Sequence, residues 1–495
     1  MKNKTKKILS KRETPFAFGV ESIIFNILSK GISFSKNVLI AVFFGASGIT
    51  DIYYSAINLI DFPTSLISNA INALIIPKYN QAKRKSFFLR SLFVAIIVIF
   101  ICTLVIFLIF GKQIASIVYS GFEKEEIYFL GKVLFIISPI ILFKPITSYF
   151  DNVLRAEKYS IFGNISRIIG AVVGLLIMIL MFKYGIYSLS ISFLISGVVT
   201  CLLLLLVINK FYTTLGDVDL KYAFYQLKDT IPLILGSCLG IINKFVDRYF
   251  ASFLEGGSIT LLNMSSSLNS VQNGLFISTF IAGFYPFISR TLAKKQLDEF
   301  EKYIRQVKKM IFGILGLISV ISLSISYPIL KIIYEHGQFK QENVQLLTEL
   351  FIIYSVLFIT SAIGNIIIQI FYSEGETIIP TVNSIFWLII NLILNYLFVK
   401  LYGVKGLALA TAIVAVLSTI TSLFLLQKKL KRIIINYKEI FIIIFILIVN
   451  VFYGYVGWNY SSLFFSLGYY ILVTKYIYSI NIKKHVKSYF TKVSK

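Results

Sequence analysis

Long apolar segments separated by short polar connections recur along the whole chain. About fourteen of them reach the roughly 20 residues that an α-helix needs to cross about 30 Å of hydrocarbon. The pattern therefore predicts a helical protein that crosses a membrane many times. The predicted spans are 17–44, 52–76, 87–111, 127–153, 161–182, 187–208, 230–254, 258–287, 309–333, 346–372, 379–400, 404–426, 438–457 and 463–481.

Cationic residues are concentrated in every second connection, as in 78–85, 290–309 and 428–432. The intervening connections hold only scattered lysines, and the imbalance is roughly thirty cations against fewer than ten. Such an excess marks the cytoplasmic side of a membrane protein, so both termini are predicted to be cytoplasmic. The connection 373–377 departs from this pattern. It is acidic, although the number of spans before it places it on the cytoplasmic side.

Two pairs of segments resemble each other across the chain. Segment 41–50 resembles 251–260, and 184–189 resembles 402–407, an offset of about six spans. An even number of spans keeps both copies in the same orientation, which indicates a parallel duplication. Chance similarity of short apolar motifs is the alternative. The expected domains are two six-helix lobes facing a central cavity (1–210 and 225–427), two further transmembrane helices (438–482) and a basic cytoplasmic tail (483–495).

The composition narrows the class of protein further. Hydrophobic residues make up 57% and charged residues only 14% of the chain, which excludes a soluble protein. The net charge of +25 does not indicate nucleic-acid binding, because the cations lie in short clusters between apolar spans. The three cysteines lie in apolar spans at long spacings, and neither histidine has a Cys or His at ligand spacing. No disulfide framework or zinc site is therefore expected.

Two lysines, Lys30 and Lys36, lie inside the first predicted span. An ionised side chain at this depth usually faces a polar cavity and a partner. With Ser33 and Asn37 the lysines form a polar wedge on the helix, which suggests a cationic wall that receives a negatively charged partner. The alternatives are snorkelling to the interface or internal pairing with acidic residues, namely Glu21, Asp51 and Asp61.

Further polar side chains lie in other spans. Arg167, Lys144 and Asp151 are intramembrane charges that are candidates for the same cavity, although simple ion pairing is favoured for Asp151. Ser266 lies on a polar face of the eighth span that is suited to hydrogen bonding with sugars or to helix packing. The predicted substrate-binding set is Lys30, Ser33, Lys36, Asn37, Asp51, Arg167 and Ser266.

Four segments of the chain carry motifs of a known family. Segment 44–56 (FGASGITDIYYSA) and segment 246–252 are similar to the motif after helix 1 and to helix 7 of the MurJ/MviN family of lipid II flippases. Segments 334–339 (YEHGQF) and 371–381 resemble the loop after helix 9 and the segment before helix 11. The resemblance runs in order from about residue 26 to 426. It implies the MOP (multidrug/oligosaccharidyl-lipid/polysaccharide) superfamily fold.

The resemblance also bears on the substrate. The family has cationic residues in helix 1, matched here by Lys30 and Lys36. Its arginines in helices 2 and 8 are not matched, since those regions read 61–65 (DFPTS) and 264–268 (MSSSL). The resemblance thus implies a flippase for an undecaprenyl-pyrophosphate-linked glycan. The glycan is either lipid II or a related surface polysaccharide unit.

Some members of this family bind sodium between helices 7, 11 and 12. The matching residues here are Asp247, Asn391, Asn395, Thr411 and the carbonyl group of Leu407. The resemblance therefore implies a candidate sodium site and no other cofactor. The alternative is that Asp247 pairs with a neighbouring cation, Lys244 or Arg248, and that the asparagines link helices by hydrogen bonds.

The chain carries no enzyme signature. It has neither a Walker A sequence nor a Gly-x-Ser-x-Gly elbow, so ATP hydrolysis and acyl transfer are not expected. The sequence predicts a multi-pass protein of the bacterial cytoplasmic membrane that works by alternating access, with membrane lipids as its other partners. The rival function is a MATE-like cation-coupled drug antiporter, whose cavity would be expected to hold acids.

Overall fold

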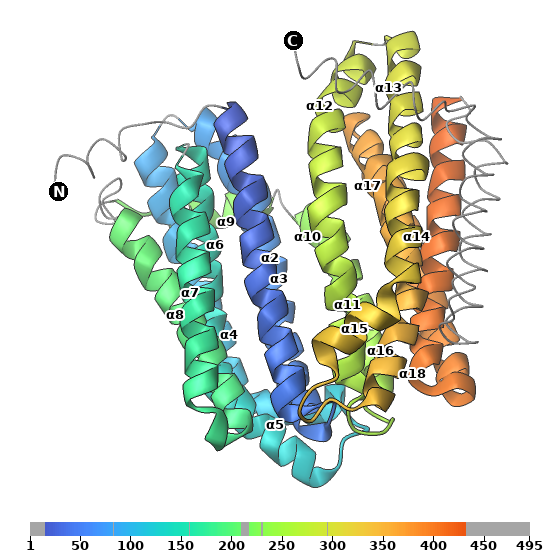
Figure 1. The fold of residues 1–495 in the computed structure, drawn as a ribbon. Helices are drawn as coiled ribbons and strands as arrows, with labels where there is room; N and C mark the ends of the chain where they lie inside the picture. The colour runs from blue at the N-terminus through green and yellow to red at the C-terminus, as the bar shows by residue number, and fades with distance from the viewer. Residues whose placement is uncertain are drawn as a thin grey trace. The chain divides into compact units, whose positions relative to one another are not determined.

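The computed structural model describes residues 15–431, except for 83, 158, 209–216, 229–230 and 295. Within them the chain forms helices joined by short loops, and it contains no strand (Figure 1). Each predicted span from 17–44 to 404–426 corresponds, in its described residues, to one helix or to consecutive helices. The prediction of an all-helical, polytopic membrane protein is therefore confirmed. The predicted spans 438–457 and 463–481 and the basic tail lie outside the described residues.

The chain divides into two compact units, one of residues 1–263 with 337–339, the other of 264–336 with the residues from 340 on. The first unit contains α2 (Pro15–Phe44), α3 (Gly48–Gln81), α4 (Lys85–Val118), α5 (Lys124–Ile137), α6 (Ile140–Ala156), α7 (Ser160–Leu180), η1 (Phe182–Tyr184), α8 (Ile186–Ile208), α9 (Leu220–Lys228) and α10 (Ile231–Ala251). Helix α11 (Ser258–Gln272) contains the boundary. The second unit continues with the π-helical η2 (Asn273–Ile277), α12 (Ser278–Ala293), α13 (Leu297–Met310), the π-helical η3 (Ile311–Leu315), α14 (Gly316–Ser324), α15 (Ser326–Tyr334), α16 (Gln341–Tyr354), α17 (Val356–Ser373) and α18 (Ile378–Leu430).

Breaks in the helices follow from local chemistry. Helices α5 and α6 form one bent span of 42°, and the bend coincides with Pro139, which has no N–H to continue the helix. Helix α18 holds two helices that meet at Gly403, where φ is +56°. A positive φ is easily adopted only by glycine. The 53-residue α18 therefore supplies both predicted spans 379–400 and 404–426.

Small residues allow α7 and α8 to pack closely. A Cβ atom on Gly170 would lie 2.0 Å from Oγ1 of Thr200, and one on Gly174 would lie 2.9 Å from the carbonyl oxygen of Ser192. Glycines spaced four residues apart let helix backbones approach in a membrane, where dispersion contacts replace the hydrophobic driving force. Next to this contact, Ile40, Tyr53, Met178 and Leu189 form a buried cluster of α2, α3, α7 and α8.

Helix α10 packs on α3 within the first unit. The rings of Phe62 and Phe245 meet edge to face, with centroids 5.1 Å apart. This helix was expected in the second lobe, 225–427, by the count of spans. Aromatic packing of this kind stabilises the contact between α3 and α10 beyond simple burial. The bounds of the two lobes stay a prediction.

The loop 337–339 also packs on the first unit. The N–H group of Gln338 donates to the carbonyl oxygen of Val42 over 2.9 Å. Gly337 has a φ of +60°, and a Cβ atom there would lie 2.3 Å from the same oxygen. Glycine is therefore required at this position both by its backbone angle and by the lack of space.

We expect Gly337→Ala to lower the melting temperature of the purified protein more than Gly375→Ala does. Gly375 also has a positive φ (+71°) but has open space around it, so it isolates the backbone cost of about 1 kcal/mol. Overlap with Val42 should add roughly 1–3 kcal/mol for Gly337→Ala. Equal shifts for the two variants would contradict the close contact.

Candidate functional site

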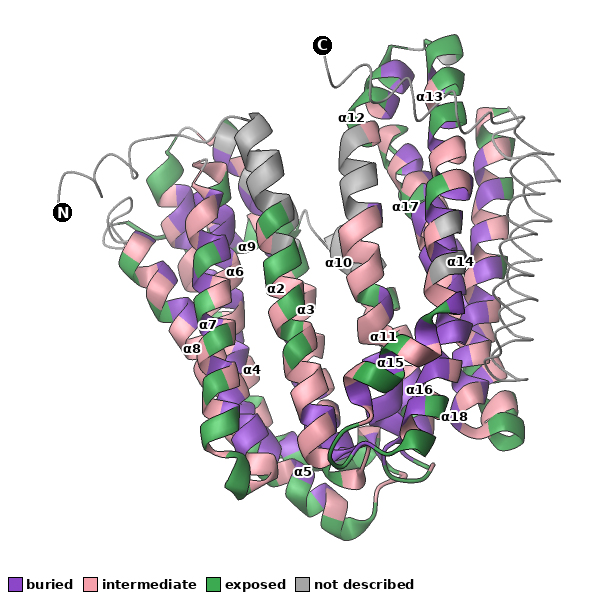
Figure 2. Ribbon diagram, viewed as in Figure 1, coloured by how far each residue is buried: buried purple, intermediate pink, exposed green. Residues whose placement is uncertain are grey.

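The predicted substrate-binding residues of α2, called the α2 strip below, are Lys30, Ser33, Lys36 and Asn37. Lys30, Lys36 and Asn37 are half-buried, and Ser33 is exposed. The described side chains of α2 are half-buried or exposed, except for Ile40 and Ala41 (Figure 2). The Ser33 hydroxyl donates to the carbonyl oxygen of Ser29 over 3.0 Å, so this polar group is satisfied within the helix.

Lys36 lies close to an aromatic ring of α8. Its Nζ is 5.6 Å from the ring centroid of Phe193, within the range of a cation–π interaction. Beside it, Oδ1 of Asn37 accepts a hydrogen bond from the Tyr54 hydroxyl over 3.4 Å. Among the described residues, no carboxylate forms an ion pair with Lys36. The ammonium group thus has an aromatic neighbour and no anionic one in this part of the chain.

Two acidic residues that were alternative partners for Lys30 and Lys36 of α2 interact with other groups instead. Asp61 forms an ion pair with Lys144, in which Oδ1 of Asp61 lies 2.6 Å from Nζ of Lys144. Both side chains are about two-fifths exposed. Asp51 is buried and hydrogen-bonded to α11, as described next. The side chain of Glu21 lies outside the described residues.

Asp51 joins α3 to the start of α11. Its Oδ1 accepts hydrogen bonds from the N–H of Thr260 at 2.7 Å and from the Thr260 hydroxyl at 2.6 Å. Its Oδ2 accepts from the N–H of Gly257 at 2.8 Å. A carboxylate at a helix N-terminus accepts hydrogen bonds from otherwise unpaired N–H groups. Its negative charge also interacts favourably with the positive end of the helix dipole. These hydrogen bonds give Asp51 a structural role, and its predicted role in substrate binding stays a prediction.

Asp151 and Arg167 belong to a cluster of paired charges. Oδ2 of Asp151 lies 2.8 Å from Nη1 of Arg167 and 3.1 Å from Nη2 of Arg155. Arg167 also donates to Oδ1 of Asn164. The predicted ion pairing of Asp151 is found. It also occupies Arg167, which leaves its predicted role in substrate binding without support in the first unit.

The predicted residues of α11 and α18 lie in the second unit. Ser266 is half-buried on α11, whereas its neighbours Ser265 and Asn269 are buried. The side-chain amide of Asn269 donates to the carbonyl oxygen of Tyr354. Part of this polar face is therefore used in helix packing, which was the alternative to sugar binding.

The residues of the predicted sodium set lie in different units. Asp247 is buried in the first unit, with Oδ2 4.0 Å from Nη1 of Arg248. In the second unit, Asn395 donates to Oδ1 of Asn391 over 3.0 Å, and Asn391 donates to the Thr411 hydroxyl over 3.5 Å. These neutral side chains fit hydrogen bonding between the two halves of α18, and alone they do not fit a cation site. Sodium binding stays a prediction.

The acidic connection 373–377 has a partner that the sequence did not reveal. Oε2 of Glu376 lies 2.7 Å from Nζ of Lys429, near the end of α18. The hydrogen bond from Lys429 lowers the pKa of Glu376 below its usual value. This pairing explains how an acidic loop is accommodated on the side expected to be rich in cations. The two residues are 53 positions apart, which is beyond the reach of sequence patterns.

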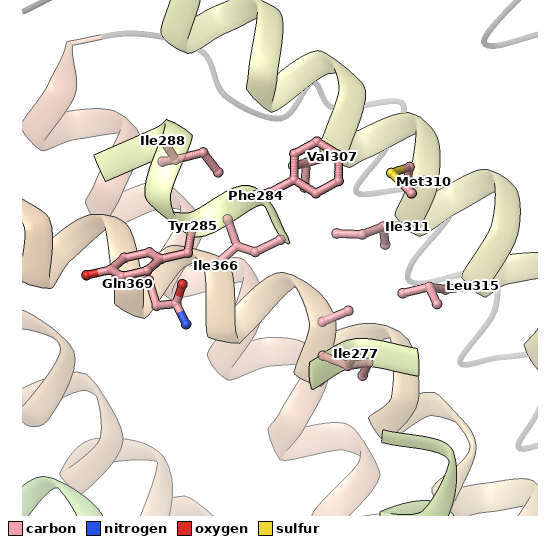
Figure 3. Close-up of a pocket in the computed structure, with 11 residues that line it drawn as sticks. Ile277, Phe284, Tyr285, Ile288, Val307, Met310, Ile311, Leu315, Ile366 and Gln369 are labelled. Atoms are coloured by element: carbon pink, nitrogen blue, oxygen red, sulfur yellow. The ribbon is translucent and has the colours of Figure 1, made fainter. Parts of the chain in front are cut away.

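A small pocket in the second unit lies among α12, η3 and α17 (Figure 3). Its volume is ≈ 20 Å³, and Gln369 contributes a polar side chain to an otherwise mainly apolar lining. A space of this size holds about one water molecule. The pocket is too small and too apolar to receive a charged headgroup.

The family model for "Lipid II flippase MurJ" matches residues 40–478. The chain belongs to the MurJ family. It is 26% identical over 431 residues to a probable lipid II flippase MurJ of Buchnera aphidicola subsp. Baizongia pistaciae, with 82% of each chain covered. It is 24% identical over 437 residues to the corresponding Aquifex aeolicus protein, with 83% of each covered.

A solved structure of lipid II flippase MurJ in an inward closed conformation has the same fold. The TM-score is 0.76 at 22% identity, and the similarity covers 95% of this chain and 100% of that chain. The MATE transporters of the MOP superfamily are also similar in fold: an inward-facing structure gives a TM-score of 0.65 at 13% identity. The expectation of a MurJ-like member of this superfamily is therefore confirmed.

In this MurJ family member, we expect Asp51→Asn to lower the free energy of unfolding by about 1–3 kcal/mol, because buried N–H groups lose a charged acceptor. Asp219→Asn is the matched control. Its Oδ1 accepts from the N–H of Tyr222 at the exposed start of α9, where an N-cap contributes about 1 kcal/mol or less. Thermal unfolding in detergent measures both. Equal losses would show that the Asp51 contact adds nothing beyond an ordinary helix cap.

Proposed function

We propose that this protein is a flippase that moves an undecaprenyl-pyrophosphate-linked glycan precursor from the inner to the outer leaflet of the bacterial cytoplasmic membrane. Membership of the MurJ family supports the class of transporter. The observation that carries the proposal is Lys36, a half-buried cation within an apolar helix and without an ion-pairing carboxylate among the described residues.

The chemistry of the headgroup suits the strip on α2. A pyrophosphate diester carries negative charge and several strong acceptor oxygens, and ammonium groups bind such oxygens through charge-assisted hydrogen bonds. Lys30 lies six residues before Lys36, which corresponds to about 9 Å along a helix. Asn37 adds a neutral polar side chain beside Lys36. Lysines act here as point charges, without the bidentate geometry of arginine.

The driving force is electrical in this proposal. An anion that moves outward is favoured by an inside-negative membrane potential, by roughly 2.3 kcal/mol per charge per 100 mV. Alternating access of the N-terminal and C-terminal helices would use this bias without ATP. No chemical step is needed, so the protein acts as a transporter and not as an enzyme.

Lipid II is the first candidate substrate, because the relatives and the family model carry that name. A second candidate is another polyprenyl-pyrophosphate glycan. It is favoured by Asp61–Lys144, an internal ion pair in the region where the family's helix 2 arginines would lie. A MATE-like antiporter is disfavoured, since α2 carries cations where a cation-binding cavity would be expected to hold acids.

Lys36→Ala should reduce transport by roughly 10- to 100-fold, the scale of losing one charge-assisted contact. Lys36→Arg should keep most of the activity because it keeps the charge. The readout is the amount of lipid-linked precursor that becomes accessible at the outer surface of cells, normalised to protein in the membrane. Lys124→Ala, at the exposed start of α5, is the control. Normal transport by Lys36→Ala would refute the role of this lysine.

Substrate identity is tested by complementation. We expect the gene to restore growth when a bacterium is depleted of its essential lipid II flippase. Rescue of a capsule-flippase mutant instead, with no rescue of the lipid II flippase, would overturn lipid II as the substrate and keep the flippase class. Rescue of neither strain by protein that reaches the membrane would contradict both.

A further inference from the structure

A groove in the first unit lies apart from the α2 strip. It has a volume of ≈ 500 Å³ and is lined by the last third of α4, by α5 and by Tyr187 at the start of α8. Its walls are mainly apolar and aromatic, with Phe107, Leu108 and Phe135 among them. Two lysines, Lys112 and Lys132, complete the lining, which contains no acidic residue.

Both lysines flank one aromatic ring. Nζ of Lys132 is 4.4 Å and Nζ of Lys112 is 5.5 Å from the ring centroid of Tyr128. The stem of Lys112 passes over Gly131, where a Cβ atom would lie 3.3 Å from Cβ of the lysine. Glycine at this position therefore lets Lys112 lie flat against α5. The result is a pair of ammonium groups held beside the same tyrosine.

The positive charge of this pair is not balanced within the described residues. No carboxylate of the described residues forms an ion pair with Lys112 or Lys132. Glu126, on the same helix α5, accepts a hydrogen bond from the N–H of Glu123 and so caps the helix start. Two neighbouring cations without a paired acid favour an anionic ligand.

The groove lies at the interfacial depth of the membrane. Lys112 follows Lys85, the first residue of α4, by 27 positions, which is about 40 Å of helix and more than the roughly 30 Å of hydrocarbon. The side chains of Val105 and Ile109, about two turns and one turn before Lys112, are exposed, as expected of a lipid-facing helix. Because the basic connection 78–85 is predicted to be cytoplasmic, Lys112 and Lys132 are expected at the outer face.

We propose that this groove binds the phosphodiester headgroup of an anionic phospholipid of the outer leaflet. Lys112 and Lys132 contact the phosphate, and an acyl chain lies along the apolar walls of α4 and α5. The lipid is favoured over free phosphate because the charged end of the groove continues into apolar walls. Tyrosine and lysine side chains at this depth are also typical anchors for a headgroup. This site is separate from the transport residues on α2 and does not depend on the proposed substrate.

Native mass spectrometry of the full chain tests the proposal. The protein is released from nanodiscs that contain equal amounts of phosphatidylglycerol and phosphatidylcholine with identical acyl chains. We expect selective retention of phosphatidylglycerol by the wild type. The pair Lys112→Gln and Lys132→Gln should weaken retention roughly fivefold for each lysine, the scale of attraction of one lysine to an anionic lipid surface. Lys112→Arg with Lys132→Arg should retain the lipid.

Lys183→Gln is the matched control, because this exposed lysine of η1 lies outside the groove lining. Equal retention of the two lipids by the wild type would overturn the proposal, whatever the variants do. Undiminished retention by the double glutamine variant, or an equal loss in Lys183→Gln, would also overturn it. So would displacement of phosphatidylglycerol by millimolar inorganic phosphate, which would identify a site for the free anion.

Discussion

The charge of Lys36, placed within an apolar helix, is the physical constraint on which the functional interpretation depends. A cation near the middle of a membrane helix costs about 2.5–3.5 kcal/mol on an insertion scale, and a cation–π contact such as that with Phe193 returns about 0.5–2 kcal/mol. Several other charges within the spans of the first unit are paired within it. Asp151 pairs with two arginines, and Asp61 pairs with Lys144. Lys36 is left to be stabilised by water or by a passing anion, which is what a transporter of a pyrophosphate lipid requires.

The repeat in the sequence corresponds to a physical contact. Segments 41–50 and 251–260, which resemble each other, meet within the first unit. The hydroxyl of Thr260 lies 2.9 Å from that of Thr50 and also donates to Asp51. Corresponding glycine-rich turns thus pack on one another, which tightly limits side-chain size at this junction. The interaction of Asp51, on α3, with the start of α11 is consequently a feature of the fold.

Hydropathy was sufficient to predict the helices of the described chain, because a membrane requires long apolar segments whose backbone groups are satisfied internally. Charged residues within the apolar spans also identified Lys36 as unusual and predicted an ion pair for Asp151. The partners of Asp51 and Glu376 could not be predicted, since they are 209 and 53 residues away and depend on tertiary packing. The edge-to-face contact of Phe245 on α10 with Phe62 on α3 could not be predicted either, because it joins positions far apart in the sequence.

The most direct test is a distance between the Lys36 ammonium group and the diphosphate. Solid-state NMR of the protein with 15Nζ-labelled lysine, in membranes that contain undecaprenyl pyrophosphate, can detect dephasing of the diphosphate 31P signal by nearby 15N nuclei. Contact predicts strong dephasing in the wild type, at separations of about 3–4 Å, and a clear loss in Lys36→Arg, which removes only that label. Equal dephasing in both proteins, or none in the wild type, would contradict the assignment of Lys36 to the headgroup.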